Sequence, residues 1–468
     1  MTTFYRPSNF LFLAIAFSFL FSQILQAQPL TRFVLSSEQQ AVQLPVSVDN
    51  SKSDALPPVY SQLYFPNCEQ ASSIYHGFAY EYNNLMHLSG KDTACQYPAN
   101  FAFNFYNQNT QQGVSFFDSF KILYEAGQPN HKEFGLDHSV GGLHWMTGEA
   151  NWESAMTRRI ERLYTFDVTT ESGIKTLKHW LYNHGDGSSY GGVAVFTFGI
   201  SSSFITLADS CPLNYIPCIK SFGGSFSHAM LIVGYHDSTF FDLNNDGKIT
   251  TDVDLNQDGQ IDLRDSEYGS WIALNSYSED WGYQGVVQLP YCLSAWEYLQ
   301  YGFCNGEAYG MVPRANHPSL TMTFKINYNQ RDKLSMKVGF NEDLEADWPS
   351  QTMDIAILNN VGGAHHMQGN DELLEERNIE MAADITPLYS LMPAGKAVKF
   401  FVILDENDPE SQGNGFLRGW RVKENGEVVC QRDDSLAICN NSCTVSSELV
   451  TLRSASDMEI LNDSIISL

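Results

Sequence analysis

The chain has 468 residues, which at roughly 150 residues per domain predicts about three structural units. Hydrophobic residues make up 43% and charged residues 17%, with 30 Phe, 23 Tyr and 8 Trp, and this composition excludes wholesale disorder. The 27 Lys and Arg against 54 Asp and Glu give a net charge of −27, and no basic stripe interrupts this excess, so we expect neither nucleic acid nor an anionic membrane surface as a partner.

The N-terminus has the pattern of a secretory signal. Arg6 is the only charge before an apolar run from Phe10 to Phe21, and small and polar residues lead to Ala27. The run is shorter than the ~20 residues that a helix needs to cross a bilayer, so it predicts a signal peptide over residues 1–27. No comparable stretch follows. We therefore expect a secreted, extracellular protein without a transmembrane segment in the mature chain.

Nine cysteines are expected to meet an oxidising environment after export, and their odd number leaves at least one thiol without an intrachain partner. Close spacing predicts the bridges Cys211–Cys218 and Cys292–Cys304, with Cys430, Cys439 and Cys443 sharing the C-terminal region. Cys68 and Cys95 have no near neighbour in the sequence. Whether they pair with each other, or Cys68 is the remaining thiol, stays open at this stage.

Residues 28–55 show no clear period and are expected to form an extended lead-in. Four later segments have helical patterns, and three short apolar runs have the length of strands. The predicted helices are 68–86, 115–126, 151–164 and 171–183, and the predicted strands are 193–198, 229–235 and 271–274. Helices followed by strands predict an α+β domain, which we place over residues 56–312.

The pattern changes from about residue 313. Apolar residues alternate with polar ones from Leu320 to Tyr328 and from Leu334 to Phe340, a period of two that is typical of half-buried antiparallel strands. Residues 397–404 read as a more buried strand, and Asn425-Gly426 indicates a hairpin turn. We expect an all-β sandwich domain over residues 313–452, followed by a polar tail over 453–468.

Two acidic segments of twelve residues lie in tandem at 242–253 and 254–265, with oxygen side chains at positions 1, 3 and 5 and glycine at position 6, as a calcium loop requires. The first loop ends in Val253, so Asp252 or Asp254 is expected to supply its last ligand. Together the loops predict structural Ca²⁺ and resemble those of dockerins and thrombospondin type 3 repeats. The candidate ligands are Asp242, Asn244, Asp246, Asp252, Asp254, Asn256, Asp258, Asp262 and Asp265.

Three distant segments carry a second pattern. Gln62 lies six residues before Cys68, His228 opens one predicted strand, and Asn275 closes another. A cysteine at a helix N-terminus becomes a nucleophile when an imidazole takes its proton, and a side-chain amide can orient that imidazole. A glutamine one short loop upstream can donate to the oxyanion that forms.

These segments resemble the papain-like cysteine peptidases, a family with a glutamine before the nucleophile, a strand-opening histidine and an Asn-Ser…Trp-Gly…Gly block. The resemblance covers roughly residues 56–312. The residues in that register are Gln62, Cys68, His228, Asn275, Ser276, Trp281, Gly282 and Gly285. It implies a two-lobed catalytic domain, a thiol peptidase and a polypeptide substrate, with Cys68 as nucleophile, His228 as base, Asn275 as its orienting group and Gln62 as oxyanion donor.

Three departures from the family pattern keep alternatives open. Glu69 replaces the tryptophan that follows the nucleophile, Tyr277 stands where the family has another aromatic, and residues 28–55 are too short for the family's long propeptide. One alternative is a catalytically inactive fold that acts as a secreted binding or adhesion protein, with cell-surface or glycan contact through the β-sandwich. Another keeps the thiol chemistry but transfers the acyl group to an amine.

The calcium loops are expected far from the thiol. His228 opens one strand and Asn275 closes the next, so an antiparallel hairpin places both residues at one end and the loops at the other. At ~3.3 Å per residue, the separation is roughly 20 Å or more. Calcium should therefore stiffen the hairpin rather than act on the substrate.

Overall fold

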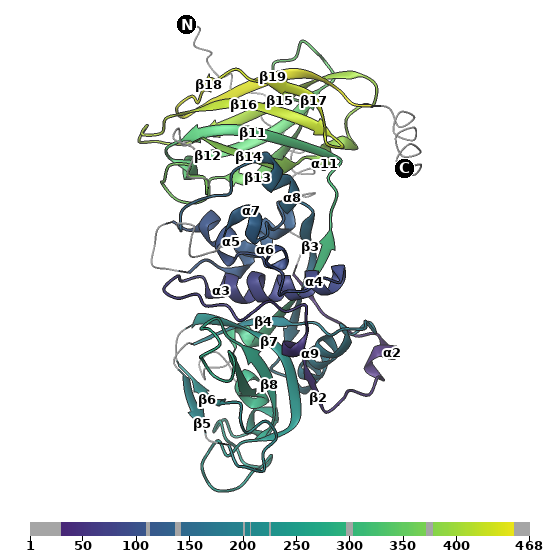
Figure 1. The fold of residues 1–468 in the computed structure, drawn as a ribbon, viewed down its shortest axis with the longest axis vertical. Helices are drawn as coiled ribbons and strands as arrows, with labels where there is room; N and C mark the ends of the chain where they lie inside the picture. Colours follow the sequence, from purple (N-terminus) through teal and green to yellow (C-terminus); the bar gives the residue numbers. More distant parts are fainter. Residues whose placement is uncertain are drawn as a thin grey trace.

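The computed structural model describes residues 30–108, 113–135, 142–199, 202–205, 207–223, 226–295, 303–370 and 378–453. The predicted signal peptide and all but the first residue of the predicted tail lie outside these ranges. Along its longest axis the molecule has three parts: paired β-sheets at one end, a layer of helices in the middle and a further sheet at the other end (Figure 1). No helix within the described ranges is long and apolar enough to cross a membrane.

The middle layer begins with the predicted helix 68–86, which is confirmed. It starts as α3 (Cys68–Gln70), continues as a π-helical segment (Ala71–Phe78) and ends as α4 (Ala79–Met86), where His87 adopts a left-handed conformation with φ of 55°. Its apolar face is buried, Ile74 and Phe78 completely. The neighbouring helices are α5 (Ala99–Tyr106), α6 (Phe116–Glu125), α7 (His131–Phe134) and α8 (Glu149–Ala155).

Ten strands of the described chain form one sheet, in the order β1-β3-β10-β4-β7-β8-β9-β6-β5, with β2 pairing to β7. Their bounds are β1 Thr31–Arg32, β2 Ser47–Asp49, β3 Arg158–Asp167, β4 Ala194–Gly199, β5 Ser202–Ile205, β6 Cys218–Phe222, β7 Phe226–Phe240, β8 Tyr268–Leu274, β9 Val286–Pro290 and β10 Glu307–Ala315. Helix α9 (Glu171–Asn183) packs against β3 and β7, and α2 (Ser37–Gln40) and α10 (Tyr291–Ala295) are short. The α+β class is confirmed.

One predicted helix is wrong. Residues 151–164 divide into the end of α8 and the first part of β3, because β3 pairs with β1 on one side and with β10 along its whole length on the other. The aromatic and β-branched residues Tyr164, Thr165 and Phe166 suit a strand. Pairing with two strands distant in the sequence, one before and one after it, outweighs the local helical spacing.

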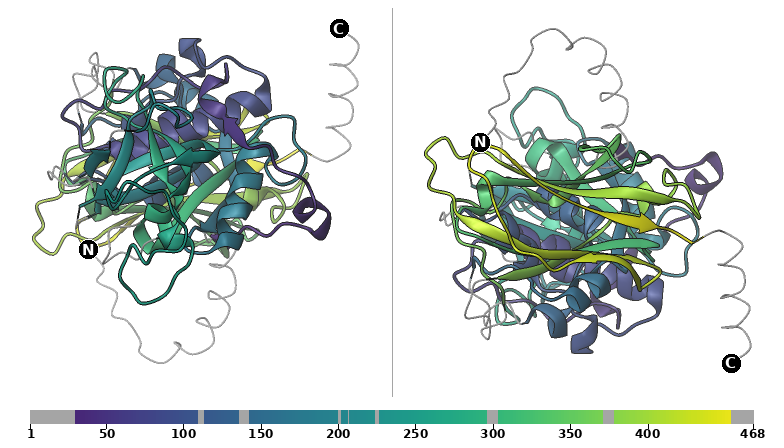
Figure 2. Two further views of the ribbon diagram at one scale, coloured as in Figure 1. Left: turned by 90° about the horizontal axis from the view of Figure 1, so that it is seen from below. Right: turned by 90° about the horizontal axis from the view of Figure 1, so that it is seen from above.

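The C-terminal part consists of two antiparallel sheets, as expected (Figure 2). The first contains β14 (Ile379–Asp384), β11 (Leu320–Tyr328), β16 (Gly415–Glu424), β17 (Glu427–Arg432) and β18 (Leu436–Ala437). The second contains β13 (Gln351–Asn359), β12 (Leu334–Asn341), β15 (Ala397–Glu406) and β19 (Cys443–Thr451), and α11 (Thr386–Tyr389) follows β14. Asn425 and Gly426 join β16 to β17 with φ of 50° and 84°, which confirms the hairpin turn.

The two all-β sheets are fixed firmly to the helical layer. Glu149 of α8 forms ion pairs with Arg421 and with Lys423, the latter at 2.8 Å, and Lys423 also pairs with Glu153 at 2.9 Å. A single apolar core continues from the helices into the sheets. The connecting strand β10 ends at Ala315, just past the expected boundary at residue 313. The sheets therefore pack directly on the helical layer.

The expected Cys211–Cys218 bridge is absent from the structure, and the expected Cys292–Cys304 bridge falls on a cysteine side chain outside the description. All eight cysteines whose side chains are described are free thiols, and the side chain of Cys304 lies outside that description. Cys211 and Cys218 have different partners. The Cys211 thiol contacts the Phe240 carbonyl oxygen at 3.3 Å, whereas Cys218 is buried at the start of β6. Cys68 and Cys95 are not joined either.

Candidate active site

Cys68 is the first residue of α3 and has 8% of its surface exposed. Its sulfur accepts a hydrogen bond from the backbone N–H of Ala229, the residue after His228. One turn along the helix, the Ser72 hydroxyl donates to the Ala229 carbonyl oxygen at 3.0 Å. These two contacts hold the N-terminal end of the helix against strand β7, so the predicted nucleophile contacts the residue that follows the predicted base.

His228 and Asn275 meet as expected. Strands β7 and β8 are antiparallel neighbours with Leu231 opposite Leu274, which places both predicted residues at the same end of the pair. His228 Nε2 lies 2.7 Å from Asn275 Oδ1. Because that oxygen can only accept, Nε2 carries the hydrogen and Nδ1 keeps a lone pair. The imidazole is thus oriented with a basic nitrogen available.

The Asn275 backbone is held by the glycine block of the sequence motif. Its N–H donates to the Gly285 carbonyl oxygen at 2.9 Å. Gly285 has φ of 81°, and a β-carbon there would meet Val59 Cγ1 at 2.6 Å, so only glycine fits this position without strain. The motif glycine therefore shapes the loop that presents the amide to His228.

Tyr277 adds a hydroxyl group that the sequence interpretation did not consider. Its ring stacks on the His228 imidazole with centroids 4.6 Å apart and planes 21° apart, and its hydroxyl lies 3.4 Å from His228 Nδ1. Burial, and next the nearby Cys68 sulfur, raises the pKa of Tyr277 to about 12. The aromatic after Asn-Ser was visible in the sequence, but the position of its polar end depends on the stacking.

Gln62 is tied to the same loop. Its backbone N–H donates to the Ser276 carbonyl oxygen at 3.0 Å, and its Oε1 accepts from the Ser276 hydroxyl at 2.7 Å. Its Nε2 donates to the Phe65 carbonyl oxygen at 2.9 Å and carries a second hydrogen. The side chain is mostly buried, and its amide is therefore fixed relative to Asn275 before any substrate arrives.

Burial keeps the thiol and the imidazole uncharged in the resting site. It raises the pKa of Cys68 to about 11, although the Ala229 N–H opposes the shift, and it lowers the pKa of His228 to about 4. Glu69 contributes negative charge beside the thiol, but its carboxylate accepts from the Phe116 N–H at 2.6 Å, and burial raises its pKa to about 7. Near neutral pH the site therefore holds a thiol beside a neutral base.

The two acidic loops join β7 to β8 at the end away from Cys68 (Figure 1). Both have the same internal hydrogen bonds: the N–H groups at positions 5 and 6 donate to the carboxylate at position 1, and the N–H at position 7 donates to position 5. The glycines at position 6, Gly247 and Gly259, have φ of 79° and 83°. The tandem repeat read from the sequence is thus a repeat in backbone structure.

The last position is where the first loop departs from the sequence interpretation, whereas the second loop follows it. In the second loop, Asp265 accepts from the N–H groups of Leu255 and Asp262, at positions 2 and 9. In the first loop the same two positions, Leu243 and Thr250, donate at 2.7 and 2.8 Å to Glu267. Glu267 therefore takes the place that we expected for Asp252 or Asp254. It lies beyond both twelve-residue segments, so the spacing within a loop could not predict it.

The chemistry of these loops suits a hard cation. Asp265 and Glu267 are both fully buried, and no lysine or arginine of the described residues forms an ion pair with Glu267. A buried carboxylate needs a positively charged partner, which a bound cation can supply. The loop oxygens accept backbone N–H groups here, and the described residues contain no converging group of three His, Cys, Asp or Glu side chains. Arg264 pairs with both Asp258 and Asp262 at 2.6 Å, so in the second loop a cation would compete with a guanidinium.

Comparison with known proteins gives structural similarity alone. No protein-family model matches the sequence, and no curated protein matches it. Xylellain, a cysteine protease from Xylella fastidiosa, is similar in structure at 17% identity and a TM-score of 0.41, over 60% of this chain and 90% of that one.

Two further solved structures are similar in the same way. The digestive procathepsin L2 proteinase from Tenebrio molitor larval midgut has 15% identity and a TM-score of 0.39, over 60% of this chain and 73% of that one. Bromelain protease from Ananas comosus has 12% identity and a TM-score of 0.36, over 57% and 99%. At these values the similarity carries no statement about activity or substrate, which must come from the site itself.

Proposed function

We propose that this protein is a cysteine-type peptidase that hydrolyses peptide bonds with Cys68, His228, Asn275 and Gln62. The observation that carries the proposal is the meeting of three distant segments: Cys68 accepts from the residue that follows His228, and His228 Nε2 lies 2.7 Å from Asn275 Oδ1. A nucleophile, a base whose Nδ1 keeps its lone pair and an orienting amide thus share one site. The resemblance of these segments to papain-like peptidases supports a polypeptide substrate.

The residues define the steps. His228 Nδ1 takes the thiol proton as Cys68 Sγ forms a bond to the substrate carbonyl carbon, and the oxyanion accepts hydrogen bonds from the Gln62 amide and the Cys68 backbone N–H. His228 then returns the proton to the leaving amine as the C–N bond breaks, which leaves a thioester. Water, deprotonated by His228, attacks the thioester and releases the carboxylate and the thiol. Asn275 holds the imidazole in the required tautomer throughout.

Casein cleavage by the purified mature protein tests this proposal. Cys68→Ala should abolish cleavage, whereas Cys95→Ala, which removes another mostly buried thiol, should leave it unchanged. Equal cleavage by wild type and Cys68→Ala would refute Cys68 as the nucleophile. A labelled amine in the same assay reveals acyl transfer, because it enters the product in place of water.

The second candidate function is a catalytically inactive fold that serves as a secreted binding protein. Two observations favour it: Glu69 stands beside the thiol, and Cys68 has only 8% of its surface exposed. Absence of cleavage in wild type, together with an unreactive Cys68, would establish this function instead. Cell-surface or glycan contact through the all-β sheets belongs to this candidate, and the described sheets show no feature that points to such a ligand.

We also propose that the two acidic loops bind structural calcium. Asp242, Asn244, Asp246 and Glu267 would hold one ion, and the second loop would use the ligands expected from the sequence, Asp254, Asn256, Asp258, Asp262 and Asp265. Calcium would supply the positive charge that two buried carboxylates require and would stiffen the turn between β7 and β8. Export from the cell, as the N-terminal pattern predicts, would expose the loops to calcium.

Chelation separates a structural from a catalytic role for calcium. Because the loops join the strands at the end away from His228 and Asn275, chelation should lower the melting temperature and the casein-cleaving activity together. A loss of activity without any change in melting temperature would place calcium at the chemistry and contradict this proposal.

A further inference from the structure

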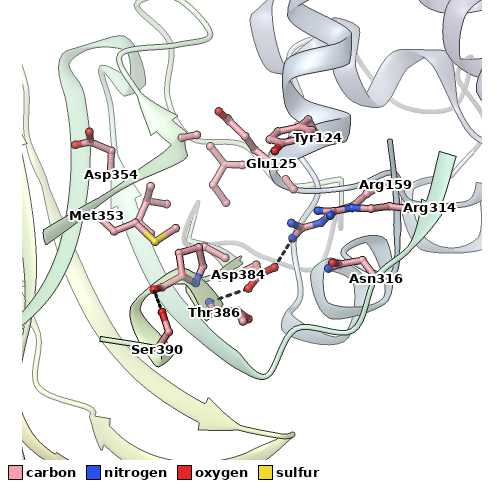
Figure 3. Close-up of a pocket in the computed structure, with 16 residues that line it drawn as sticks. Tyr124, Glu125, Arg159, Arg314, Asn316, Met353, Asp354, Asp384, Thr386 and Ser390 are labelled. Atoms are coloured by element: carbon pink, nitrogen blue, oxygen red, sulfur yellow. Dashed lines mark hydrogen bonds and ion pairs between the residues drawn. The ribbon is translucent and has the colours of Figure 1, made fainter. Parts of the chain in front are cut away.

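A cavity of about 460 Å³ lies where the helical layer meets the all-β sheets. Tyr124 and Glu125 at the end of α6 border one side, Met353 and Asp354 of β13 lie opposite, and the guanidinium groups of Arg159 and Arg314 point into the space from a third side (Figure 3). The volume falls within the range of pockets that hold small ligands. This cavity is separate from the Cys68 site.

The two arginines form an unfavourable pair. Arg159 on β3 and Arg314 on β10 stand directly opposite each other in the antiparallel register. Like charges in this arrangement destabilise a sheet. The Arg159 side chain has only 6% of its surface exposed, so water screens the repulsion poorly. Two cations in this position call for more negative charge than the fold provides.

The carboxylates nearby leave the arginines partly unsatisfied. Arg159 Nη2 lies 3.1 Å from Asp384 Oδ2, and Asp384 also accepts from the Thr386 N–H at 2.9 Å. The Nε atoms of Arg159 and Arg314 are buried and have no hydrogen-bond acceptor among the described residues. Burying donors without an acceptor is costly.

The two other carboxylates at the cavity offer little compensation. Burial raises the pKa of Glu125 to about 7, so near neutral pH this group carries much less than a full negative charge. Asp354 is largely exposed and pairs with Lys337 at 3.4 Å. The arginine wall of the cavity therefore keeps an excess of positive charge.

The opposite wall is apolar. Met353, Ile355 and Ile357 come from alternate positions of β13, and Ala383 and Pro387 lie beside them. A ligand that fits must therefore carry negative charge at one end and hydrocarbon at the other. A guanidinium presents its N–H groups in a plane that matches a carboxylate.

We propose that this cavity binds an apolar ligand with a single carboxylate, which lies against Arg159 and Arg314. The chemistry is shared by two sources: the C-terminus of a peptide that ends in a large apolar residue, and a free aliphatic carboxylic acid. The proposal does not depend on the peptidase activity, because none of its residues belongs to the Cys68 site.

Calorimetric titration of the full mature protein tests the ligand class. N-acetyl-L-phenylalanine represents the peptide C-terminus, octanoate represents the free acid, and the corresponding amides lack the charge. At least one acid should bind with a stoichiometry of one. Its amide should bind with an affinity at least about tenfold lower. The acid that binds more tightly identifies the source. Failure of both acids to bind at millimolar concentration overturns the proposal.

Variants of the arginine pair test the site. Arg314→Met should weaken binding of the acid about tenfold or more, while the melting temperature of the free protein stays the same or rises, because the substitution removes a repulsion. Arg162→Met, on the neighbouring strand β3 with about half of its side chain exposed, should change neither binding nor melting. If Arg314→Met lowers the melting temperature and binds the acid as wild type does, Arg314 is structural and the proposal is wrong. Arg314→Gln provides the same test with a polar side chain.

Discussion

Replacing Glu267 by alanine should remove one of two bound calcium ions and leave the other. Glu267 is fully buried, and its carboxylate accepts from the backbone N–H groups of Leu243 and Thr250 at 2.7 and 2.8 Å, the contacts that Asp265 makes in the second loop. Asp252, one of the two residues that we expected to supply this ligand, lies on the exposed surface. Glu267→Ala should therefore remove one calcium ion and Asp252→Ala should remove none, which makes Asp252→Ala the matched control.

The magnitude has two parts. Loss of the acceptor for two backbone donors should cost about 1–3 kcal/mol of unfolding free energy without calcium. An ion at a concentration of 100 times its dissociation constant adds about 2.7 kcal/mol to the native state, and Glu267→Ala should lose this part as well. Asp252→Ala should change the free energy of unfolding by less than about 0.5 kcal/mol.

Calorimetric titration with calcium gives the stoichiometry, and urea unfolding in excess calcium and in a chelator gives the two free energies. Wild type and Asp252→Ala should bind two ions, and Glu267→Ala one. If Asp252→Ala loses the ion while Glu267→Ala keeps it, the assignment of Glu267 is wrong. If wild type binds no calcium, the calcium proposal fails altogether.

Substitutions at three positions near the thiol give further predictions. Burial raises the pKa of Glu69 to about 7 in the folded protein, so above about pH 4.5 the native state binds more protons than the unfolded chain and loses stability as the pH rises to 7. Glu69→Gln should therefore stabilise the protein by about 1–3 kcal/mol at pH 8 and little at pH 4, as measured by urea unfolding. Gln62→Ala should lower kcat for peptide cleavage about 100-fold or more, yet leave alkylation of Cys68 by iodoacetamide unchanged, because alkylation forms no oxyanion; a parallel loss of both would show that Gln62 only supports the fold. Tyr277→Phe keeps the ring on His228 and should retain kcat within about threefold, whereas Tyr277→Ala should lose about tenfold; equal kcat in both variants would mean that the stacking has no role.

Local patterns predicted much of the fold. The helix over 68–86, the alternating strands from Leu320 and Leu334 and the Asn425-Gly426 turn each follow from a period or a turn preference within a few residues. The strand over 158–167 could not be predicted in this way, because its partners β1 and β10 lie more than 120 positions away in the sequence, one on each side. The firm packing of the all-β sheets on the helices likewise depends on ion pairs between residues about 270 positions apart.

The candidate site was predictable as far as its motifs reach. Cys68, His228, Asn275 and Gln62 stand in fixed register with neighbouring residues, and the structure brings them together. Glu267 and the Tyr277 hydroxyl were not predictable, since one completes a loop from outside its repeat and the other depends on how two rings stack. The expected Cys211–Cys218 bridge is absent because close spacing in sequence does not by itself direct two thiols toward each other.

The reactivity of Cys68 as a function of pH tests most directly whether this site is a working thiol–imidazole pair. Burial raises the pKa of Cys68 and lowers that of His228, so from about pH 5 upward His228 is neutral and able to take the thiol proton. Alkylation of Cys68 by iodoacetamide, followed by peptide mass spectrometry, should therefore be nearly constant between about pH 5 and 8. The His228→Ala variant should react far more slowly, with a rate that rises about tenfold per pH unit. A wild-type protein whose Cys68 shows that tenfold rise and is unaffected by His228→Ala would contradict the proposal of an active peptidase.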